Sequence, residues 1–289
     1  MNNIINIGIL GGDKRQIELA NILHEDGQNV FITGFDKALD KVKVLNLNID
    51  QMLKNSEYIV LPIPSTRDDL YFFTPFSEFK TPINDVFIRK IKNKTVFCYG
   101  AEGLIELCPE FSNCNFYDYS ANENFLQHNA KITADCAIEL AKNKFVNSFC
   151  NKKVLVCGYG RIGKYLVELL VKENTELFVS VRNKNDFSKL EKMKVQPILT
   201  SELKEYTNFD IIFNTVPSLI FDFDTLEKTS KHALLIDLAS KPGGVDKLSA
   251  EQLNINLIHA LGLPGKMAPL KAAEAIKNTI YNFIREEKE

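Results

Sequence analysis

The feature of this sequence that most constrains its fold is a short apolar run followed at once by three spaced glycines. The run Val154-Leu155-Val156-Cys157 is typical of a strand buried on both faces of a parallel sheet. It is followed by Gly158-Tyr159-Gly160-Arg161-Ile162-Gly163 and then by apolar residues at helical spacing. A strand, a Gly-x-Gly-x-x-Gly turn and a helix in this order predict a βαβ unit that binds a dinucleotide. A strand, turn and helix with incidental glycines is the alternative interpretation.

Each glycine of the turn has its own role in such a unit. Gly158 permits the tight turn, Gly160 lets the backbone approach the pyrophosphate, and Gly163 lets the helix pack on the strand. The pyrophosphate accepts hydrogen bonds from free backbone N–H groups at the positive end of the helix dipole. We therefore expect a cofactor site formed by this turn and by the loop after a later strand, with the residues Gly158, Tyr159, Gly160, Arg161, Ile162, Gly163, Thr215, Val216 and Pro217.

The residue that reads the adenosine ribose normally lies about 20 positions after the first glycine, as an acid for NAD or with a nearby arginine for NADP. Here Arg182 lies 24 positions after Gly158, and no acid stands beside it. An arginine, helped by Ser180, Asn183 or Lys184, can bind a dianionic phosphate through charge-assisted hydrogen bonds. The sequence therefore predicts NADP rather than NAD, although stacking of Arg182 on adenine would leave that preference open.

Short apolar runs alternate with helical segments along the whole chain, which is the pattern of parallel sheets covered by helices. With 289 residues, 45% of them hydrophobic, the chain is long enough for two cores. We expect an α/β fold of two Rossmann-like domains with parallel doubly wound sheets and a cleft between them. The predicted strands are residues 4–10, 29–33, 58–62 and 95–99, and then 154–157, 177–181, 195–198, 211–214, 233–237 and 256–259.

The predicted domains are a substrate-side domain over residues 1–128, a connector helix over 129–150, and an NADP-binding domain over 151–268. The connector has helical spacing, with a capping box predicted between Ser120 and Glu123 or a second helix starting at Thr133. The tail is an amphipathic helix with Pro269 in its first turn. By analogy with two-domain dehydrogenases, this helix, over 269–287, is expected to pack back on the first domain. The aromatic segment 65–92 is expected to be an insertion or a packing loop.

Composition excludes several classes of function. The chain has 35 basic and 37 acidic residues, so no charge imbalance favours nucleic acid or an anionic membrane as partner. Its six cysteines form no C-x-x-C pair, and we expect neither a metal site nor a disulfide framework. No signal peptide is recognisable, and no stretch approaches the roughly 18 apolar residues of a membrane span. We expect a cytoplasmic protein that acts on a small molecule.

A second glycine turn, Gly11-Gly12-Asp13, also follows a predicted strand. It lacks the third glycine, and Asp13 would place negative charge where a pyrophosphate must lie. We interpret this turn as part of the substrate side.

Polar residues stand at three predicted strand ends in the second half, where doubly wound folds bind ligands. These segments are Asn214-Thr215-Val216-Pro217, residues 237–244 and residues 259–266. Lys241 and Lys266 could neutralise substrate carboxylates, and Asp237 or His259 could move protons. Structural alternatives stay open, because Asp237 can cap a loop, His259 can be a core imidazole, and Lys266 can be a solvated charge.

With these segments the sequence resembles the family of dipicolinate synthase A subunits from endospore-forming bacteria along essentially its whole length. The resemblance is carried by Gly11-Gly12-Asp13-Lys14-Arg15-Gln16, by 129–138, by 158–163, by Asn214-Thr215-Val216-Pro217, by 237–244 and by 262–269. The two last segments are the more specific, since many dehydrogenases share the glycine turn. The chain departs from the family pattern at Ile132, Asp135 and Cys136.

The resemblance implies an NADP-dependent oxidoreductase that converts 4-hydroxy-tetrahydrodipicolinate to dipicolinate in sporulation, working with a flavoprotein-like B subunit in a hetero-oligomer. Cationic partners for the two substrate carboxylates would come from Arg15, Arg67, Lys241 and Lys266, in a substrate site that includes Asp13. Asn129, Thr133 and Asn214 would orient the substrate. For the proton transfers we expect Lys241 first, then His259 or Asp237.

Two other interpretations remain. One is another two-domain NAD(P)-dependent dehydrogenase of the 2-hydroxyacid type, which usually pairs a catalytic histidine with an acid and an arginine. Only His259 is suitably placed here, and no arginine lies between Arg182 and Arg285. The other is a non-catalytic nucleotide-binding partner protein, whose cofactor site would look the same in sequence.

Overall fold

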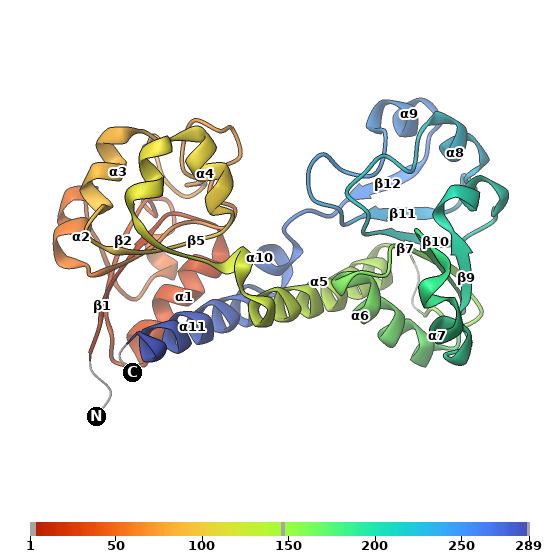
Figure 1. The fold of residues 1–289 in the computed structure, drawn as a ribbon, viewed down its shortest axis with the longest axis horizontal. Coiled ribbons are helices and arrows are strands. Elements are labelled where there is room, and N and C mark those ends of the chain that lie inside the picture. The colour runs from red at the N-terminus through yellow and green to blue at the C-terminus, as the bar shows by residue number, and fades with distance from the viewer. Residues whose placement is uncertain (1–3, 146–147, 288–289) are drawn as a thin grey trace. The chain divides into compact units, whose positions relative to one another are not determined.

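The computed structural model describes residues 4–145 and 148–287 and divides into two compact units (Figure 1). The first unit comprises Met1–Asn129 and Pro264–Glu289, and the second comprises Ala130–Leu263. Each contains a six-stranded sheet in which all paired strands are parallel. The predicted α/β class with two doubly wound parallel sheets is confirmed.

The sheet of the first unit has the strand order β3-β2-β1-β4-β5-β6. Its strands are β1 (Asn6–Leu10), β2 (Asn29–Thr33), β3 (Leu45–Asn46), β4 (Tyr58–Val60), β5 (Thr95–Cys98) and β6 (Asn115–Asp118). One core cluster joins the sheet to α1 (Lys14–Glu25) and α11 (Pro269–Glu286). A second cluster joins it to α2 (Ile49–Asn55), α3 (Asp85–Ile91) and α4 (Ala101–Leu107). Helices therefore cover both faces of this sheet.

The C-terminal helix α11 belongs to the first unit because its apolar face packs against α1. Ala273, Ile276 and Ile280 are buried in the same cluster as the apolar residues of α1. At the end of α1, Asp26 accepts a hydrogen bond from the Tyr281 hydroxyl at 2.9 Å and pairs with Lys277 at 2.9 Å. These contacts join α11 to α1, the first helix of the first unit.

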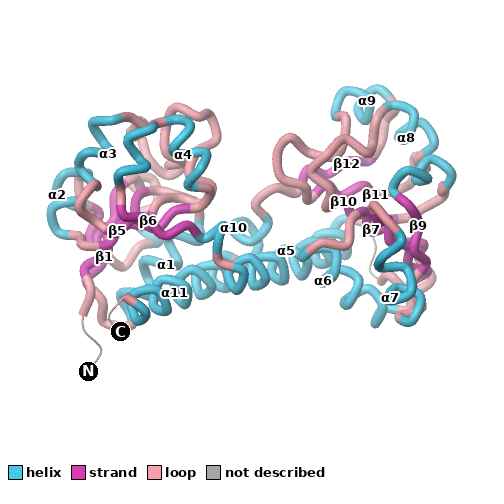
Figure 2. Tube along the Cα trace, viewed as in Figure 1, coloured by secondary structure: helices cyan, strands magenta, loops and turns pink. Residues whose placement is uncertain are grey.

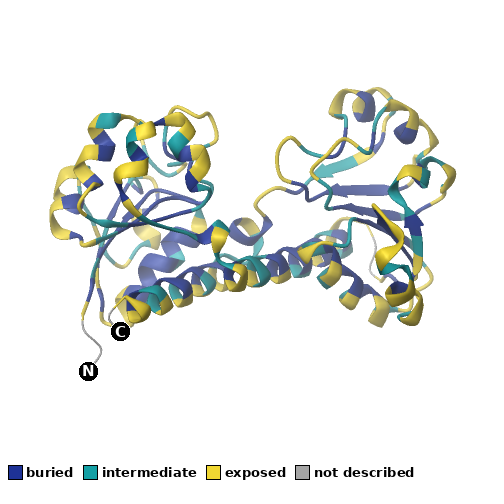
Figure 3. Ribbon diagram, in the orientation of Figure 1, coloured by how far each residue is buried: buried dark blue, intermediate teal, exposed yellow. Residues whose placement is uncertain are grey.

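The sheet of the second unit has the order β12-β11-β10-β7-β8-β9, the same pattern of neighbours as the first. Figure 2 shows the strands of both sheets in magenta. Its strands are β7 (Lys153–Cys157), β8 (Glu176–Val181), β9 (Gln196–Leu199), β10 (Ile211–Asn214), β11 (Leu234–Asp237) and β12 (Asn256–His259). Its helices include α6 (Arg161–Leu170), α7 (Phe187–Lys192), α8 (Phe223–Lys228) and α9 (Lys247–Gln252). In Figure 3 the central strands are coloured as buried, in agreement with their apolar sequences.

Three expectations differ from the structure. The helix predicted over 129–150 is α5 (Glu123–Lys144), one continuous helix, so no second helix starts at Thr133. The capping box predicted for Ser120 is wrong, because the side chain of Asn122 caps α5 by accepting from Phe125 N at 2.8 Å. The backbone N–H of Ser120 instead donates a hydrogen bond to Asp118 Oδ1 at 2.7 Å. Segment 65–92 is not all loop, since it ends in α3.

Among the described residues, none of the helices combines the length and the apolar character that crossing a membrane requires.

Candidate active site and cofactor site

The glycine turn between β7 and α6 is held by close backbone packing. Gly158 has φ +92° and donates its N–H to the Ser180 carbonyl at 2.9 Å. A Cβ at Gly163 would lie 2.1 Å from the Gly158 carbonyl oxygen, and a Cβ at Gly158 would lie 2.6 Å from Thr215 Oγ1. The backbone carbonyl of Gly158 cannot give way to a Cβ at Gly163, and the positive φ of Gly158 disfavours any other residue there, so these two glycines fix the approach of α6 to the sheet.

The N-terminus of α6 is suited to bind an anion. Gly160 is its N-cap, no side chain in the described part of the chain forms a cap hydrogen bond there, and its first turn carries no acid. A Cβ at Gly160 would meet no atom within 4 Å, so the space above the turn is open. Free backbone N–H groups and the helix dipole at this end favour a phosphate group. The residues present therefore fit the pyrophosphate of a dinucleotide.

Two lysines that the sequence analysis did not single out lie beside this turn. The Nζ atoms of Lys164 and Lys189 are 5.7 Å and 5.6 Å from the centre of the Tyr159 ring. The hydroxyl of Tyr159 reaches Met193 Sδ at 3.9 Å, so this side chain extends towards the end of α7. The contacts place positive charge on both the α6 and α7 sides of the turn.

The residues at the end of β8 differ in what they can reach. Arg182 and Asn183 are exposed, and Asn183 Oδ1 accepts from Asn185 N at 3.1 Å. Ser180 is fully buried, and its hydroxyl interacts with Thr200 Oγ1 at 3.4 Å. The expected help of Ser180 in binding a phosphate is therefore not supported, because its side chain lies inside the sheet packing.

Cys157, the last residue of β7, is not a nucleophile at neutral pH. Burial raises the pKa of its thiol to about 12, although a hydrogen bond with Ser180 acts in the opposite direction. A second cysteine, Cys108, lies close to Asp85 and Glu110 in a group that could hold a metal ion. Its Sγ is 3.3 Å from Asp85 Oδ1, and burial raises its pKa, so the thiol keeps its proton. We propose no metal there.

Three neighbouring strands of the second sheet end in a row of interacting side chains. Asn214, Asp237 and His259 are the last residues of β10, β11 and β12 and lie opposite one another in register. Asn214 Nδ2 donates to Asp237 Oδ1 at 2.8 Å, and His259 Nδ1 is 3.4 Å from Asp237 Oδ2. The structure thus brings together three of the predicted site residues at the carboxyl edge of the sheet.

The members of this row differ in exposure. Asp237 is 1% exposed and Asn214 is fully buried, whereas the His259 side chain is 28% exposed. Among the described residues, none forms a hydrogen bond with the Nε2 atom of His259, although that atom is buried. An imidazole held through Nδ1 by a carboxylate, with Nε2 unpaired, has the arrangement of a general acid or base.

Asn214 is committed to internal hydrogen bonds. Its Nδ2 also donates to the Val216 carbonyl at 3.2 Å, and its Oδ1 accepts from Val216 N at 3.1 Å. A Cβ at Gly244 would lie 2.1 Å from Asn214 Nδ2, so the loop after β11 covers this side chain closely. These contacts favour a positioning role for Asn214 over the expected contact with substrate. Lys241 lies exposed on the same loop.

Four residues expected at the substrate side gather near the carboxyl end of β1 in the first unit. Asp13 caps α1 and binds Arg15 through Nε at 2.9 Å and Nη2 at 3.0 Å. A Cβ at Gly265, the neighbour of Lys266, would lie 2.2 Å from Asp13 Oδ2. Arg67 stacks 4.2 Å from the Phe73 ring centre, and the carbonyl of Phe73 accepts from Gly12 N at 2.8 Å.

The four residues differ in exposure and in whether their charge is paired. Arg15 is 4% exposed and its guanidinium is neutralised by Asp13, whereas Arg67 and Lys266 are exposed cations. The remaining expected residues, Asn129 and Thr133, are one helical turn apart on α5, so they lie on one face of that helix.

Two family models match separate parts of the chain. The model for the N-terminal domain of the dipicolinate synthase A subunit matches residues 6–113, and Shikimate / quinate 5-dehydrogenase matches residues 139–260. The dipicolinate synthase A subunit of Bacillus subtilis (strain 168) is 28% identical over 296 residues, which cover 98% of this chain and 96% of that protein.

Solved structures agree with these matches. The A subunit of dipicolinate synthase from Bacillus halodurans has a TM-score of 0.82 at 25% identity and covers 97% of this chain and 99% of its own. The A chain of dipicolinate synthase from Bacillus subtilis has a TM-score of 0.81 at 26% identity, covering 99% and 97%. The transhydrogenase from Sinorhizobium meliloti, at 11% identity and TM-score 0.65, is similar in fold alone. Sequence and fold agree over nearly the full length, and the chain is similar to dipicolinate synthase A subunits throughout, with the model of that family's N-terminal domain matched over residues 6–113.

Proposed function

We propose that this chain is the A subunit of a dipicolinate synthase and oxidises 4-hydroxy-tetrahydrodipicolinate to dipicolinate with NADP⁺ in sporulation. The observation that carries the proposal lies at one edge of the second sheet. There the uncapped N-terminus of α6 follows β7, and the Asp237–His259 pair ends β11 and β12. A dinucleotide site and a pair suited to proton transfer on the same sheet edge are what a dehydrogenase needs.

In this proposal the turn and two cationic regions bind the cofactor. Backbone N–H groups of α6 donate to the pyrophosphate, and Arg182 and Asn183 hold the 2′-phosphate. Lys189, over the Tyr159 ring, adds positive charge to the same region. These cations and the absence of an acid at position 182 support NADP over NAD. When bound, the nicotinamide ring accepts a hydride from the substrate ring.

The reaction removes one water molecule and then one hydride and one proton, which leaves pyridine-2,6-dicarboxylate. We assign the proton transfers to His259 Nε2, with Asp237 holding the imidazole through Nδ1. Asn214 holds Asp237 in turn and is a positioning residue. Lys241, exposed on the loop after β11, donates the proton that departs with the hydroxyl.

Two substrate carboxylates need cationic partners, and Arg67 and Lys266 are the exposed cations near the end of β1. Arg15 already binds Asp13, so we assign these two residues to shaping the turn from which the neighbouring cations extend. Asn129 and Thr133 orient the ring through the face of α5 that they share. A B subunit completes a hetero-oligomer in the cytoplasm.

The Asp237–His259 pair also favours a second candidate, a dehydrogenase of the 2-hydroxyacid type, because that chemistry uses a histidine paired with an acid. Such an enzyme would reduce a 2-oxo acid with NAD(P)H and would form no product from the hydroxylated ring.

The test is a coupled assay in which 4-hydroxy-tetrahydrodipicolinate is generated in situ and NADP⁺ is added with the chain, alone and then with a B subunit. Dipicolinate, followed by its ultraviolet absorbance, is expected only when this chain is present. Oxidation of NADPH by 2-oxo acids without dipicolinate formation would favour the second candidate. Binding of NADPH with no turnover in either assay would indicate a non-catalytic partner protein.

A further inference from the structure

A cavity of about 520 Å³ lies in the first unit at the carboxyl ends of β2 and β3. Its volume is within the range of small-molecule sites. The lining includes the polar residues Thr33, Asp36 and Asn46 and the apolar residues Ile49, Phe79 and Val86. None of these residues has a role in the chemistry proposed above.

The position of this cavity corresponds to a known part of a dinucleotide-binding unit. Gly11 N donates to the Thr33 carbonyl at 2.9 Å, just as Gly158 N donates to the Ser180 carbonyl at 2.9 Å. Asp36 lies 25 positions after Gly11, and Arg182 lies 24 positions after Gly158. Since these hydrogen bonds align Thr33 with Ser180, Asp36 lies one position beyond the counterpart of Arg182, in the loop of the first sheet that corresponds to the ribose-reading loop. An acid at that point hydrogen-bonds the ribose hydroxyls.

The carboxylate of Asp36 is held by neutral donors. It accepts hydrogen bonds from Ser77 Oγ at 2.8 Å, Asn46 Nδ2 at 3.1 Å and the backbone N–H of Glu78 at 3.2 Å. Burial opposes ionisation, but these hydrogen bonds lower the pKa of Asp36 below its usual value. Within residues 4–145 and 148–287 it forms no ion pair.

Beside Asp36 lies an acceptor with no donor. The Oδ1 atom of Asn46 is buried and has no hydrogen-bond partner in the described part of the chain. A buried acceptor of this kind is normally satisfied by a protein group, water or ligand. Two adjacent acceptors, a carboxylate and an amide oxygen, match a ligand that donates from two adjacent hydroxyls.

The rest of the surroundings favours an uncharged ligand with a flat apolar part. Phe79 and Val86 are 75% and 64% exposed at the cavity and offer apolar surface. The two lysines of the lining, Lys80 and Lys90, are paired with Asp68 and Asp50. The phosphate position is closed as well, because Asp13 caps α1, the helix that follows Gly11 and Gly12.

We propose that this cavity binds an uncharged nucleoside, with the ribose diol on Asp36 and Asn46 and the base against Phe79 and Val86. The two units would then bind different ligands: the second binds the phosphorylated cofactor, and the first binds a nucleoside that carries no phosphate.

The proposal is tested by calorimetric titration of adenosine into the full chain saturated with NADPH, which blocks an adenosine site in the second unit. We expect a saturable site with one adenosine per chain. 2′-Deoxyadenosine, which lacks the diol, should bind at least tenfold more weakly. Adenosine 5′-monophosphate should also bind more weakly, because the Asp13 carboxylate already occupies the N-terminus of α1 where its phosphate would bind.

Two variants test the location. Asp36→Asn keeps the shape and removes the charge, and should weaken adenosine at least tenfold. Since it also alters the hydrogen bonds to Ser77 and Glu78, Val86→Trp is the second variant, which fills the cavity from its exposed side and should abolish binding. Asp40→Asn, an exposed acid of the same unit outside the lining, is the matched control and should bind as the parent does.

No saturable heat with adenosine at millimolar concentration would overturn the proposal. Equal affinity for adenosine and 2′-deoxyadenosine would overturn it too, and so would unchanged binding in the Val86→Trp variant. The inference does not depend on the cofactor assignment, because Val86→Trp distinguishes this cavity from any site in the second unit.

Discussion

Replacing Asp237 with asparagine tests the central feature of the candidate active site. Asp237 is 1% exposed, and its carboxylate accepts from Asn214 Nδ2 at 2.8 Å and from Ala239 N at 3.3 Å while facing His259 Nδ1 at 3.4 Å. Asparagine has the same shape but only one acceptor oxygen. Because Asn214 and the backbone both donate to Oδ1, the new amide nitrogen is expected to take the place of Oδ2 and to face His259.

The consequences of Asp237→Asn can be estimated from these contacts. Hydrogen bonds to a charged group contribute about 1.5–3 kcal/mol and neutral ones about 0.5–1.5 kcal/mol, so the free energy of unfolding should fall by about 1–3 kcal/mol. Facing an N–H donor, His259 must accept at Nδ1 and carry its proton on Nε2. With the tautomer reversed, turnover should fall by roughly 10²–10⁴-fold, while NADPH affinity stays unchanged.

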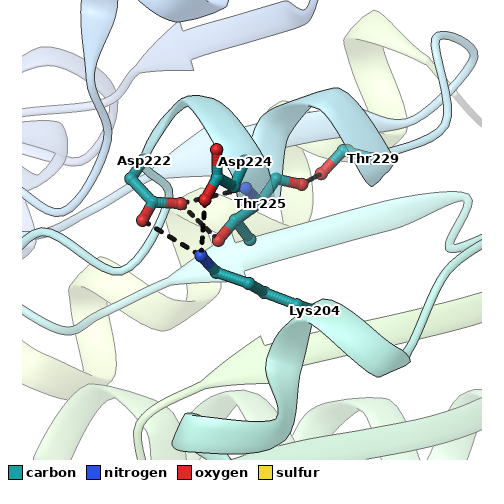
Figure 4. Close-up of polar contacts among 5 residues, drawn as sticks. All are labelled: Lys204, Asp222, Asp224, Thr225 and Thr229. Atoms are coloured by element: carbon teal, nitrogen blue, oxygen red, sulfur yellow. Dashed lines mark hydrogen bonds and ion pairs between the residues drawn. The ribbon is translucent and has the colours of Figure 1, made fainter.

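Dipicolinate formation, NADPH titration and urea unfolding measure these three quantities. The matched control is Asp224→Asn, in an exposed ion-pair cluster of the same unit where Lys204 lies between Asp222 and Asp224 (Figure 4). Exposed pairs contribute little, so the control should leave turnover and stability unchanged. Turnover of Asp237→Asn within threefold of the parent would refute the role of the Asp237–His259 pair in proton transfer.

Four further predictions concern single residues. Gly160→Ala should leave stability unchanged, since its Cβ meets no atom within 4 Å, but it should weaken NADPH binding at least tenfold by occupying the pyrophosphate position. Gly163→Ala, by contrast, should lower the thermal midpoint of unfolding, because its Cβ would lie 2.1 Å from the Gly158 carbonyl oxygen. Arg182→Ala should weaken NADPH more than tenfold, on the order of 1.4 kcal/mol, and leave NADH nearly unchanged in fluorescence titrations; equal losses would exclude the phosphate contact. Lys241→Ala should abolish dipicolinate formation while NADPH still binds, and undiminished turnover would remove Lys241 from the mechanism. For Asp118, burial opposes ionisation, but hydrogen bonds from Ala101 and Ser120 lower its pKa below 3.8 in the folded chain. Its contribution to stability is therefore present above pH 3.8 and is lost as the pH falls through the lower folded pKa. In urea unfolding at a series of pH values, the free energy of unfolding of Asp118→Asn should fall less steeply at acid pH than that of the parent.

The central strands could be predicted from sequence because they are continuous apolar runs. The edge strands of the first sheet could not, since β3 has two residues and the two aromatic residues of β6 are flanked by Asn115 and Asp118, whereas the edge strands β9 and β12 of the second sheet were predicted. At the edge of a sheet half of the backbone hydrogen bonds are missing, and apolar burial is smaller, so the pattern that marks a strand is weak there.

The residues of the candidate site that could be predicted from sequence are those at the ends of strands. In a parallel sheet the last residues of neighbouring strands meet at one edge, which is why Asn214, Asp237 and His259 were grouped from sequence and lie together in the structure. Interactions that depend on the packing of other elements were not predictable. The burial of Ser180 needed both faces of β8 to be covered, and the position of Lys189 over Tyr159 needed the packing of α7.

The two sheets show how a small local difference can separate two functions on one topology. Both have the same order of strands, and both join the first glycine to the neighbouring strand by the same hydrogen bond. After that point they diverge: Asp13 places a carboxylate on the N-terminus of α1, while Gly160 leaves the N-terminus of α6 uncapped. The Asp13 carboxylate already occupies the N-terminus of α1, so we place the proposed pyrophosphate site in the second unit and not in the first. In the proposed assignment the turn, rather than the sheet, therefore determines which unit holds the phosphorylated cofactor.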